Sequence, residues 1–180
     1  VIHGIPSKKK ILREGDIVKI DLGACYKGYH GDSARTIPVG KVSDEAAKLI
    51  EVTRNSFFAG VGQLKAGNRL GDVGSAIDTL VKENGFSTVR KYIGHGIGKE
   101  VHEAPDVPNY GTPGRGVRIC SGMVLAIEPM VNVGTYEVKC LSDGWTVKTV
   151  DGSLSAHYEN TILITDGEPE LLTDPDAKAE

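Results

Sequence analysis

Four acidic residues lie within or directly beside the most apolar, strand-like segments of this chain, and they constrain its fold more than any other feature. Carboxylates are depleted in β-strands and are almost never fully buried without a partner. These residues are Asp21, Asp32, Glu128 and Glu159. One such residue could be a charge at a strand edge that faces solvent. Four in the same context indicate that the fold gathers carboxylates around a group that compensates their charge.

The first two carboxylates can be placed by the geometry of a hairpin. Segments 17–22 and 29–39 have the composition of strands, and a two-residue loop at Lys27-Gly28 would join them. In that register Asp21 and Asp32 project from the same face as diagonal neighbours, with their backbones about 7–8 Å apart. Two carboxylates that converge in this way need a proton or a cation between them.

Among the five histidines, His95 stands out because glycines at 94, 96 and 98 surround it and allow a close approach of the backbone. The segment has the spacing of neither a Walker loop nor a dinucleotide-binding loop. Four carboxylates and one imidazole form an oxygen-rich donor set that suits Mn²⁺, Fe²⁺ or Co²⁺ better than a structural zinc. Two divalent ions would balance the four carboxylates. The sequence therefore predicts a dinuclear centre, a kind of site that generates a nucleophile for hydrolysis at neutral pH.

Length and composition exclude several other classes of protein. The 180 residues suit a single domain, and the net charge of −3 argues against a nucleic-acid partner such as DNA. We see no apolar segment long enough to cross a membrane and no leader sequence. Three cysteines without a CxxC pair indicate neither a disulfide framework nor a zinc site, and free thiols favour the cytoplasm.

The order of the predicted elements indicates an α+β fold. After the hairpin, Ser43 is a candidate N-cap for a helix with apolar residues at 46, 50, 57 and 61. A second amphipathic helix with apolar residues at 70, 73, 77 and 80 would end at Asn84-Gly85. Strands are expected at 123–127, 131–133, 136–141, 145–150 and 158–165. The sequence thus predicts an antiparallel sheet with helices on one face, in one domain of residues 1–180 that ends in a polar tail at 166–180.

The candidate residues occur in specific motifs. These are VIHGIP at 1–6, GDIVKID at 15–21, YHGD at 29–32, GHGIG at 94–98 with HEAP at 102–105, GMVLAIEP at 122–129, and DGWT at 143–146 with SAHYENT at 155–161. Together they resemble the type I, bacterial-type methionine aminopeptidases, and the resemblance extends to about Asp166. It implies the pita-bread fold, in which helices lie outside a curved antiparallel sheet and a dinuclear metal site lies at its centre.

The resemblance also implies a role for each matching residue. Two divalent ions (Co, Mn or Fe(II)) would be held by Asp21, Asp32, His95, Glu128 and Glu159, with Asp32 and Glu159 bridging both. Glu128 would also move a proton, and His3 and His102 would contact the substrate and stabilise the tetrahedral intermediate. Trp145 would form part of the pocket for the methionine side chain. His30 and His157 receive no role and are expected to be structural or to support the ligands.

The implied function is removal of the initiator methionine from nascent polypeptides by attack of a metal-bridged hydroxide on the first peptide bond. The partners expected are peptides with an N-terminal Met, and the enzyme would be a cytoplasmic monomer. The basic cluster of Lys8, Lys9, Lys10 and Arg13 could make a transient contact with the ribosome.

Two alternatives remain open from the sequence. The first is a related aminopeptidase P or prolidase-type metallopeptidase, although the GWT stretch at 144–146 favours the methionine enzyme. The second is a truncated chain that binds metal and peptide ends with little or no turnover. Family members normally carry an N-terminal segment before the position of His3, and this sequence lacks it. The chain is therefore expected to be a fragment or a shortened form.

Overall fold

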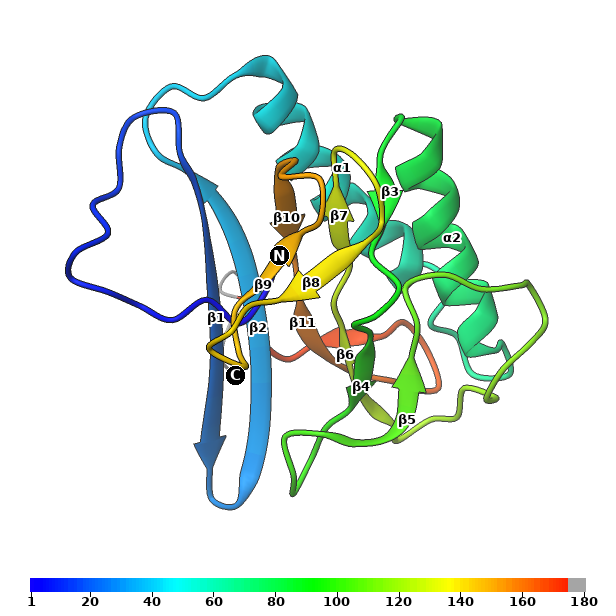
Figure 1. The fold of residues 1–180 in the computed structure, drawn as a ribbon. Helices are drawn as coiled ribbons and strands as arrows, with labels where there is room; N and C mark the ends of the chain where they lie inside the picture. Colours follow the sequence, from blue (N-terminus) through cyan, green and yellow to red (C-terminus); the bar gives the residue numbers. More distant parts are fainter. Residues whose placement is uncertain (175–180) are drawn as a thin grey trace.

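A computed structural model describes residues 1–174 and has the predicted order of a hairpin, two helices and a series of short strands (Figure 1). The helices are α1 (Asp44–Val61) and α2 (Leu70–Glu83). The strands are β1 (Ile17–Tyr26), β2 (Tyr29–Pro38), β3 (Ser87–Thr88), β4 (Gly94–Gly96), β5 (Glu103–Val107), β6 (Val124–Ile127), β7 (Met130–Asn132), β8 (Val138–Cys140), β9 (Val147–Thr149), β10 (Ser155–His157), β11 (Asn160–Leu163) and β12 (Glu170–Leu171).

The β1–β2 hairpin has the register that the sequence predicts. Asp21 pairs with Ala34 and Gly23 with Asp32, and the strands continue to the turn. Lys27 and Gly28 occupy that turn with φ angles of 51° and 82°. Two positive φ angles in a row match the right-handed twist of the flanking strands, so this two-residue turn fixes the pairing of the whole hairpin. Its first strand is four residues longer than the predicted segment 17–22.

The two helices begin and end close to the predicted positions. The side chain of Ser43 accepts a hydrogen bond from the backbone N–H of Ala46, which caps α1, and Asn84 ends α2. In α1 the buried apolar side chains include Leu49 and Val52, whereas the predicted positions 50 and 61 are only half-buried. The helix is rotated slightly from the predicted orientation because it packs against both α2 and the sheet.

The strands form four antiparallel sheets. The largest has the order β12-β11-β6-β4-β5, and a second has the order β10-β7-β3. Two short crossings connect these sheets, from β6 to β7 through Glu128-Pro129 and from β10 to β11 through residues 158 and 159, and a longer connection through residues 89–93 joins β3 to β4. Proline has no N–H to donate to a ladder, which is consistent with an interruption of pairing there. The two crossings lie side by side because β6 pairs with β11 and β7 pairs with β10.

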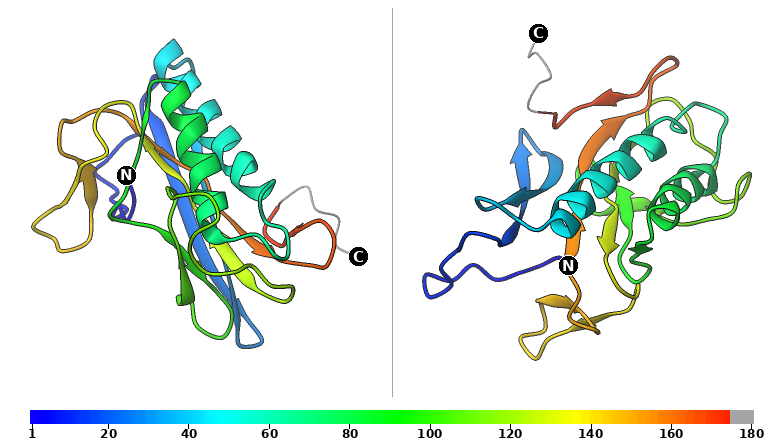
Figure 2. Two further views of the ribbon diagram at one scale, coloured as in Figure 1. Left: turned by 90° about the vertical axis from the view of Figure 1, so that its right-hand side faces the viewer. Right: turned by 90° about the horizontal axis from the view of Figure 1, so that it is seen from above.

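The main core lies between the helices and the sheets. Both helices lie on the same side of the molecule, as the two further views show (Figure 2). Phe57 and Ile77 from the helices pack in one cluster with Leu125, Ile127 and Ile162 from the strands, and all five are fully buried. Each such side chain contributes roughly 1.5–3 kcal/mol to folding. The sheets are thereby held rigidly against the helices, which fixes the positions of the two crossings.

The segment after β11 differs in part from the expected polar tail. Within it, β12 pairs with β11, and the side chain of Thr173 contacts the backbone of Asp32 and the side chain of Asn160. The remainder of the expected tail, residues 175–180, lies outside the described residues. Among residues 1–174, neither helix combines the length and the apolar character needed to cross a bilayer.

Candidate metal centre

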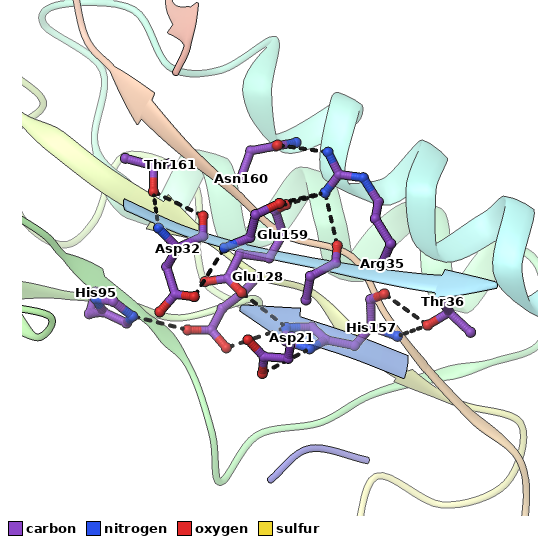
Figure 3. Close-up of polar contacts among 12 residues, drawn as sticks. Asp21, Asp32, Arg35, Thr36, His95, Glu128, His157, Glu159, Asn160 and Thr161 are labelled. Atoms are coloured by element: carbon purple, nitrogen blue, oxygen red, sulfur yellow. Dashed lines mark hydrogen bonds and ion pairs between the residues drawn. The ribbon is translucent and has the colours of Figure 1, made fainter. Parts of the chain in front are cut away.

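The structure brings together the five sequence-predicted ligands, although they come from five separate parts of the chain (Figure 3). Asp21 lies on β1, Asp32 on β2 and His95 on β4, whereas Glu128 and Glu159 occupy the two crossings between sheets. Backbone hydrogen bonds in both directions between Ala34 and Glu159 join the hairpin to the second crossing. The hairpin therefore carries its two carboxylates to the point where the chain changes sheets.

The donor atoms form two groups that share one carboxylate. Asp32, His95 and Glu159 form one, and Asp21, His157 and Glu159 form the other, with the donor atoms of each group within 4.8 Å of one another. Glu128 lies between the two imidazoles. Its Oε1 is 3.6 Å from Nε2 of His95 and its Oε2 is 3.5 Å from Nε2 of His157. The arrangement is that expected for two cations side by side with a shared ligand.

Burial and mutual repulsion govern the protonation of these groups. Burial, with the nearby carboxylates of Asp21 and Asp32, raises the pKa of Glu128 to about 8. Burial and the neighbouring Glu128 carboxylate raise the pKa of Glu159 well above its ordinary value. Burial also raises the pKa of Asp21 and lowers that of His157 to about 4. In the chain alone, desolvation therefore disfavours the charged form of each of these groups.

A divalent cation fits this site on the chemistry of its donors. Within residues 1–174, the basic side chains at ion-pair distance from these carboxylates are the imidazoles of His95 and His157, and no lysine or arginine is among them. Both ring nitrogens of the fully buried His157 lack a hydrogen-bond partner. Buried carboxylates and imidazoles without partners are costly, and a bound cation would satisfy both kinds of group at once.

A second set of contacts holds the backbone of the crossing at Glu159. The guanidinium of Arg35 donates to the backbone carbonyls of Ala34 and Glu159 and to the side-chain oxygen of Asn160. It also stacks over the ring of Tyr158, 4.2 Å from the ring centroid. Because one planar group makes all of these contacts, it holds the backbone from which the Glu159 side chain projects.

The glycines around His95 serve strand packing. A Cβ at Gly94 would lie 2.3 Å from the backbone oxygen of Ala126, and one at Gly96 would lie 2.3 Å from that of Ala104. The narrow β4 strand therefore fits between β5 and β6 only because these positions have no side chain. The close backbone approach that the glycines predict is confirmed, and the groups that approach β4 are the backbones of β5 and β6.

Of the three residues with a predicted substrate role, His102 lies against a candidate ligand, and His3 and Trp145 lie against each other. His102 is exposed, and its ring centroid is 4.3 Å from that of His95. His3 and Trp145 form a stacked pair with centroids 4.8 Å apart, and the Trp145 side chain is half exposed. His3 has a φ angle of 57°, which is uncommon for a residue with a side chain and is often associated with functional sites.

Sequence reasoning missed two residues of this region. Arg35 lies among the strand residues of the hairpin, and nothing in its local sequence indicates that it reaches the backbone of Glu159. His157 lies two residues before Glu159, and alternate residues of a strand share a face, so this spacing was an available signal. His30 lies elsewhere, since its backbone N–H donates to the carbonyl of Gly98.

Comparison with known proteins adds an independent line of evidence. Residues 1–166 match the model of metallopeptidase family M24. A methionine aminopeptidase of Clostridium acetobutylicum is 61% identical over 173 residues, which are 96% of this chain and 69% of that protein. The match therefore leaves close to a third of the relative's length without a counterpart in the present sequence.

Solved structures give the same assignment of the fold. The crystal structure of methionine aminopeptidase from Thermotoga maritima superposes with a TM-score of 0.94 at 50% identity, and covers 96% of this chain and 69% of its own. Prolidase from Pyrococcus furiosus superposes less well, with a TM-score of 0.77 at 30% identity, and the match covers 45% of its chain. Both identity and superposition therefore favour the aminopeptidase over the prolidase.

Proposed function

The chain belongs to metallopeptidase family M24, and from this premise we propose that it removes the N-terminal methionine from peptides and newly made proteins. One structural observation supports the proposal above the others: two carboxylate–imidazole groups share Glu159 at the junction of the sheets. Relatives that are 47–61% identical are named methionine aminopeptidases, which points to the same substrate class.

We assign the binding of two divalent ions to the five ligands that the sequence predicts. Carboxylate-rich sites with a single imidazole suit Mn²⁺, Fe²⁺ or Co²⁺. When bound, the ions supply a nucleophile at neutral pH and a Lewis acid for the scissile carbonyl. The residues assigned are Asp21, Asp32, His95, Glu128 and Glu159.

The remaining steps are assigned to side chains of this protein. Glu128 would accept a proton on its carboxylate and pass it to the leaving amine. His3 and His102 would donate hydrogen bonds to the negative charge that develops on the carbonyl oxygen. The exposed face of Trp145 would pack against the thioether of the methionine side chain.

The cellular setting is part of the same proposal. An enzyme that processes new proteins would work in the cytoplasm, and we infer that this one acts as a monomer. The cluster Lys8, Lys9 and Lys10 with Arg13 is exposed, which leaves it available for a transient contact with the ribosome.

A peptide assay tests the proposed function. The chain loaded with Co²⁺, Mn²⁺ or Fe²⁺ should release Met from Met-Ala-Ser, and Glu159→Ala should abolish that release. Faster cleavage of Ala-Pro than of Met-Ala would favour a prolidase-type activity instead. Binding of two ions without release of Met would support the truncated, inactive form, and calorimetry separates that result from a failure to bind metal.

A further inference from the structure

His157 is the one histidine that the structure places inside the cluster of carboxylates and for which the proposed function has no role. It is the last residue of β10, directly before the crossing that carries Glu159. The hydroxyl of Thr36 accepts from its backbone N–H at 2.8 Å and donates to its carbonyl at 2.9 Å. Pairing with Met130 on β7 holds the other side of the strand. The position of the imidazole is therefore fixed from both neighbouring strands.

The ring of His157 is enclosed and surrounded by acidic oxygens (Figure 3). The residue is 2% exposed. Its Nε2 is 3.5 Å from Oε2 of Glu128 and 4.0 Å from Oε2 of Glu159, and its Nδ1 is 4.0 Å from Oδ2 of Asp21. Neither ring nitrogen has a hydrogen-bond partner. A buried imidazole directed at three carboxylates without bonding to any of them needs a further group to explain it.

These separations are those of atoms that share an ion. Hydrogen bonds from nitrogen to oxygen span roughly 2.7–3.2 Å, so all three contacts are too long. Two ligands that each lie about 2.1 Å from one ion are separated by roughly 3.4 Å at a tetrahedral angle and by more at wider angles. The spacing around His157 falls in that range, as does the 3.6 Å between His95 and Glu128.

The two donor groups are also matched in composition. Each contains one aspartate from the hairpin and one histidine, and both use Glu159. His95 serves one group and His157 occupies the equivalent place in the other. A site with His95 alone would leave the second ion with oxygen ligands only and would leave His157 without any partner.

We propose that a ring nitrogen of His157 is a sixth protein ligand, and binds the ion that Asp21 and Glu159 hold. The proposal rests on the assignment of a dinuclear centre to this site. It makes the centre a pair of ions with one imidazole each. The competing role is structural, in which His157 fills space behind the carboxylates and never contacts an ion.

Cobalt substitution distinguishes these roles in the unmodified protein. High-spin Co²⁺ shifts the protons of directly bound imidazoles far outside the ordinary NMR range, and ring N–H protons disappear in D₂O. The chain loaded with two equivalents of Co²⁺ should show two such exchangeable signals, one from His95 and one from His157. A single signal with two ions bound would overturn the proposal while leaving the dinuclear centre intact.

A variant gives the second readout. His157→Gln keeps a similar volume and hydrogen-bonding capacity but removes the imidazole, so it should lose one shifted signal and bind one of the two Co²⁺ ions at least about tenfold more weakly by calorimetry. His30→Gln, which removes an imidazole outside the cluster, should retain both signals and both affinities. Circular dichroism of the metal-free variants checks the fold. Unchanged signals and affinities in His157→Gln would refute the proposal, and a failure of the unmodified chain to bind Co²⁺ would refute it together with the metal centre.

Discussion

Replacing Glu128 by Gln should change how the stability of the metal-free protein depends on pH. The Glu128 pKa is about 8 in the folded chain and near 4.5 in the unfolded chain. Between these values folding takes up a proton, so the free energy of unfolding decreases as pH rises. Gln has no proton to release, so the variant lacks this dependence. Each proton changes the free energy by about 1.4 kcal/mol per pH unit.

The expected magnitude follows from that slope. Between pH 6.5 and 8 the stability of Glu128→Gln relative to the unmodified chain should rise by about 1.6 kcal/mol, because the slope falls to half as the pH reaches the Glu128 pKa. The Glu128 carboxylate also raises the pKa of Glu159, so its removal acts in the same direction.

Urea unfolding followed by circular dichroism, at several pH values in the presence of a chelator, measures this difference. Added Mn²⁺ or Co²⁺ should reverse the trend for the unmodified chain, because metal binding requires deprotonated ligands and strengthens as pH rises. Parallel stability curves for the two chelated proteins from pH 6.5 to 8 would refute the reasoning. They would mean that Glu128 is ionised in the folded chain without a cation.

Three further substitutions test the packing and the substrate face. Gly94→Ala should destabilise the fold by more than about 2 kcal/mol in thermal or urea unfolding, because the added methyl meets backbone, whereas Gly4→Ala meets no atom within 4 Å and should be nearly neutral. Arg35→Lys keeps the charge but loses the planar set of hydrogen bonds at Glu159, so we expect the free energy of unfolding to fall by about 1–3 kcal/mol. Metal binding measured by calorimetry should also weaken, and an unchanged affinity would contradict this role of Arg35. Trp145→Ala should raise KM for Met-Ala-Ser and leave metal affinity unchanged. A loss of metal affinity would instead mean that the Trp145 ring supports the metal centre and does not contact the substrate.

The hairpin was predictable from the sequence because its register depends on local chemistry alone. A two-residue turn with positive φ at Lys27 and Gly28 fixes every pair in the ladder, including those of Asp21 and Asp32. The cap at Ser43 is local in the same sense. The rotation of α1 was not predictable, because the choice of Leu49 over Ile50 as the buried residue depends on the elements that cover the helix.

The crossings between sheets mark the limit of a local analysis. The sequence predicts a strand from 158 to 165, whereas in the structure β11 begins only at Asn160. The preceding strand, β10, was not predicted and belongs to a different sheet, so Glu159 lies in the gap between the two. Pro129 signals the interruption at the first crossing, but the second lacks a proline. That interruption follows from the pairing of β10 and β11 with strands that are themselves interrupted at Glu128-Pro129.

His157 shows why residue spacing could not decide the ligand set. His157 precedes Glu159 by two residues, and His30 precedes Asp32 by the same interval, so alternation along a strand places each imidazole beside a carboxylate. The outcomes differ because His30 lies next to the hairpin turn, where its ring faces the carbonyl of Gly98, at 3.4 Å from Nδ1. His157 lies at the junction of two sheets, where Thr36 and Met130 hold its backbone and the ring is directed into the centre. The long-range pairing of β10, and not the local sequence, makes His157 a candidate ligand.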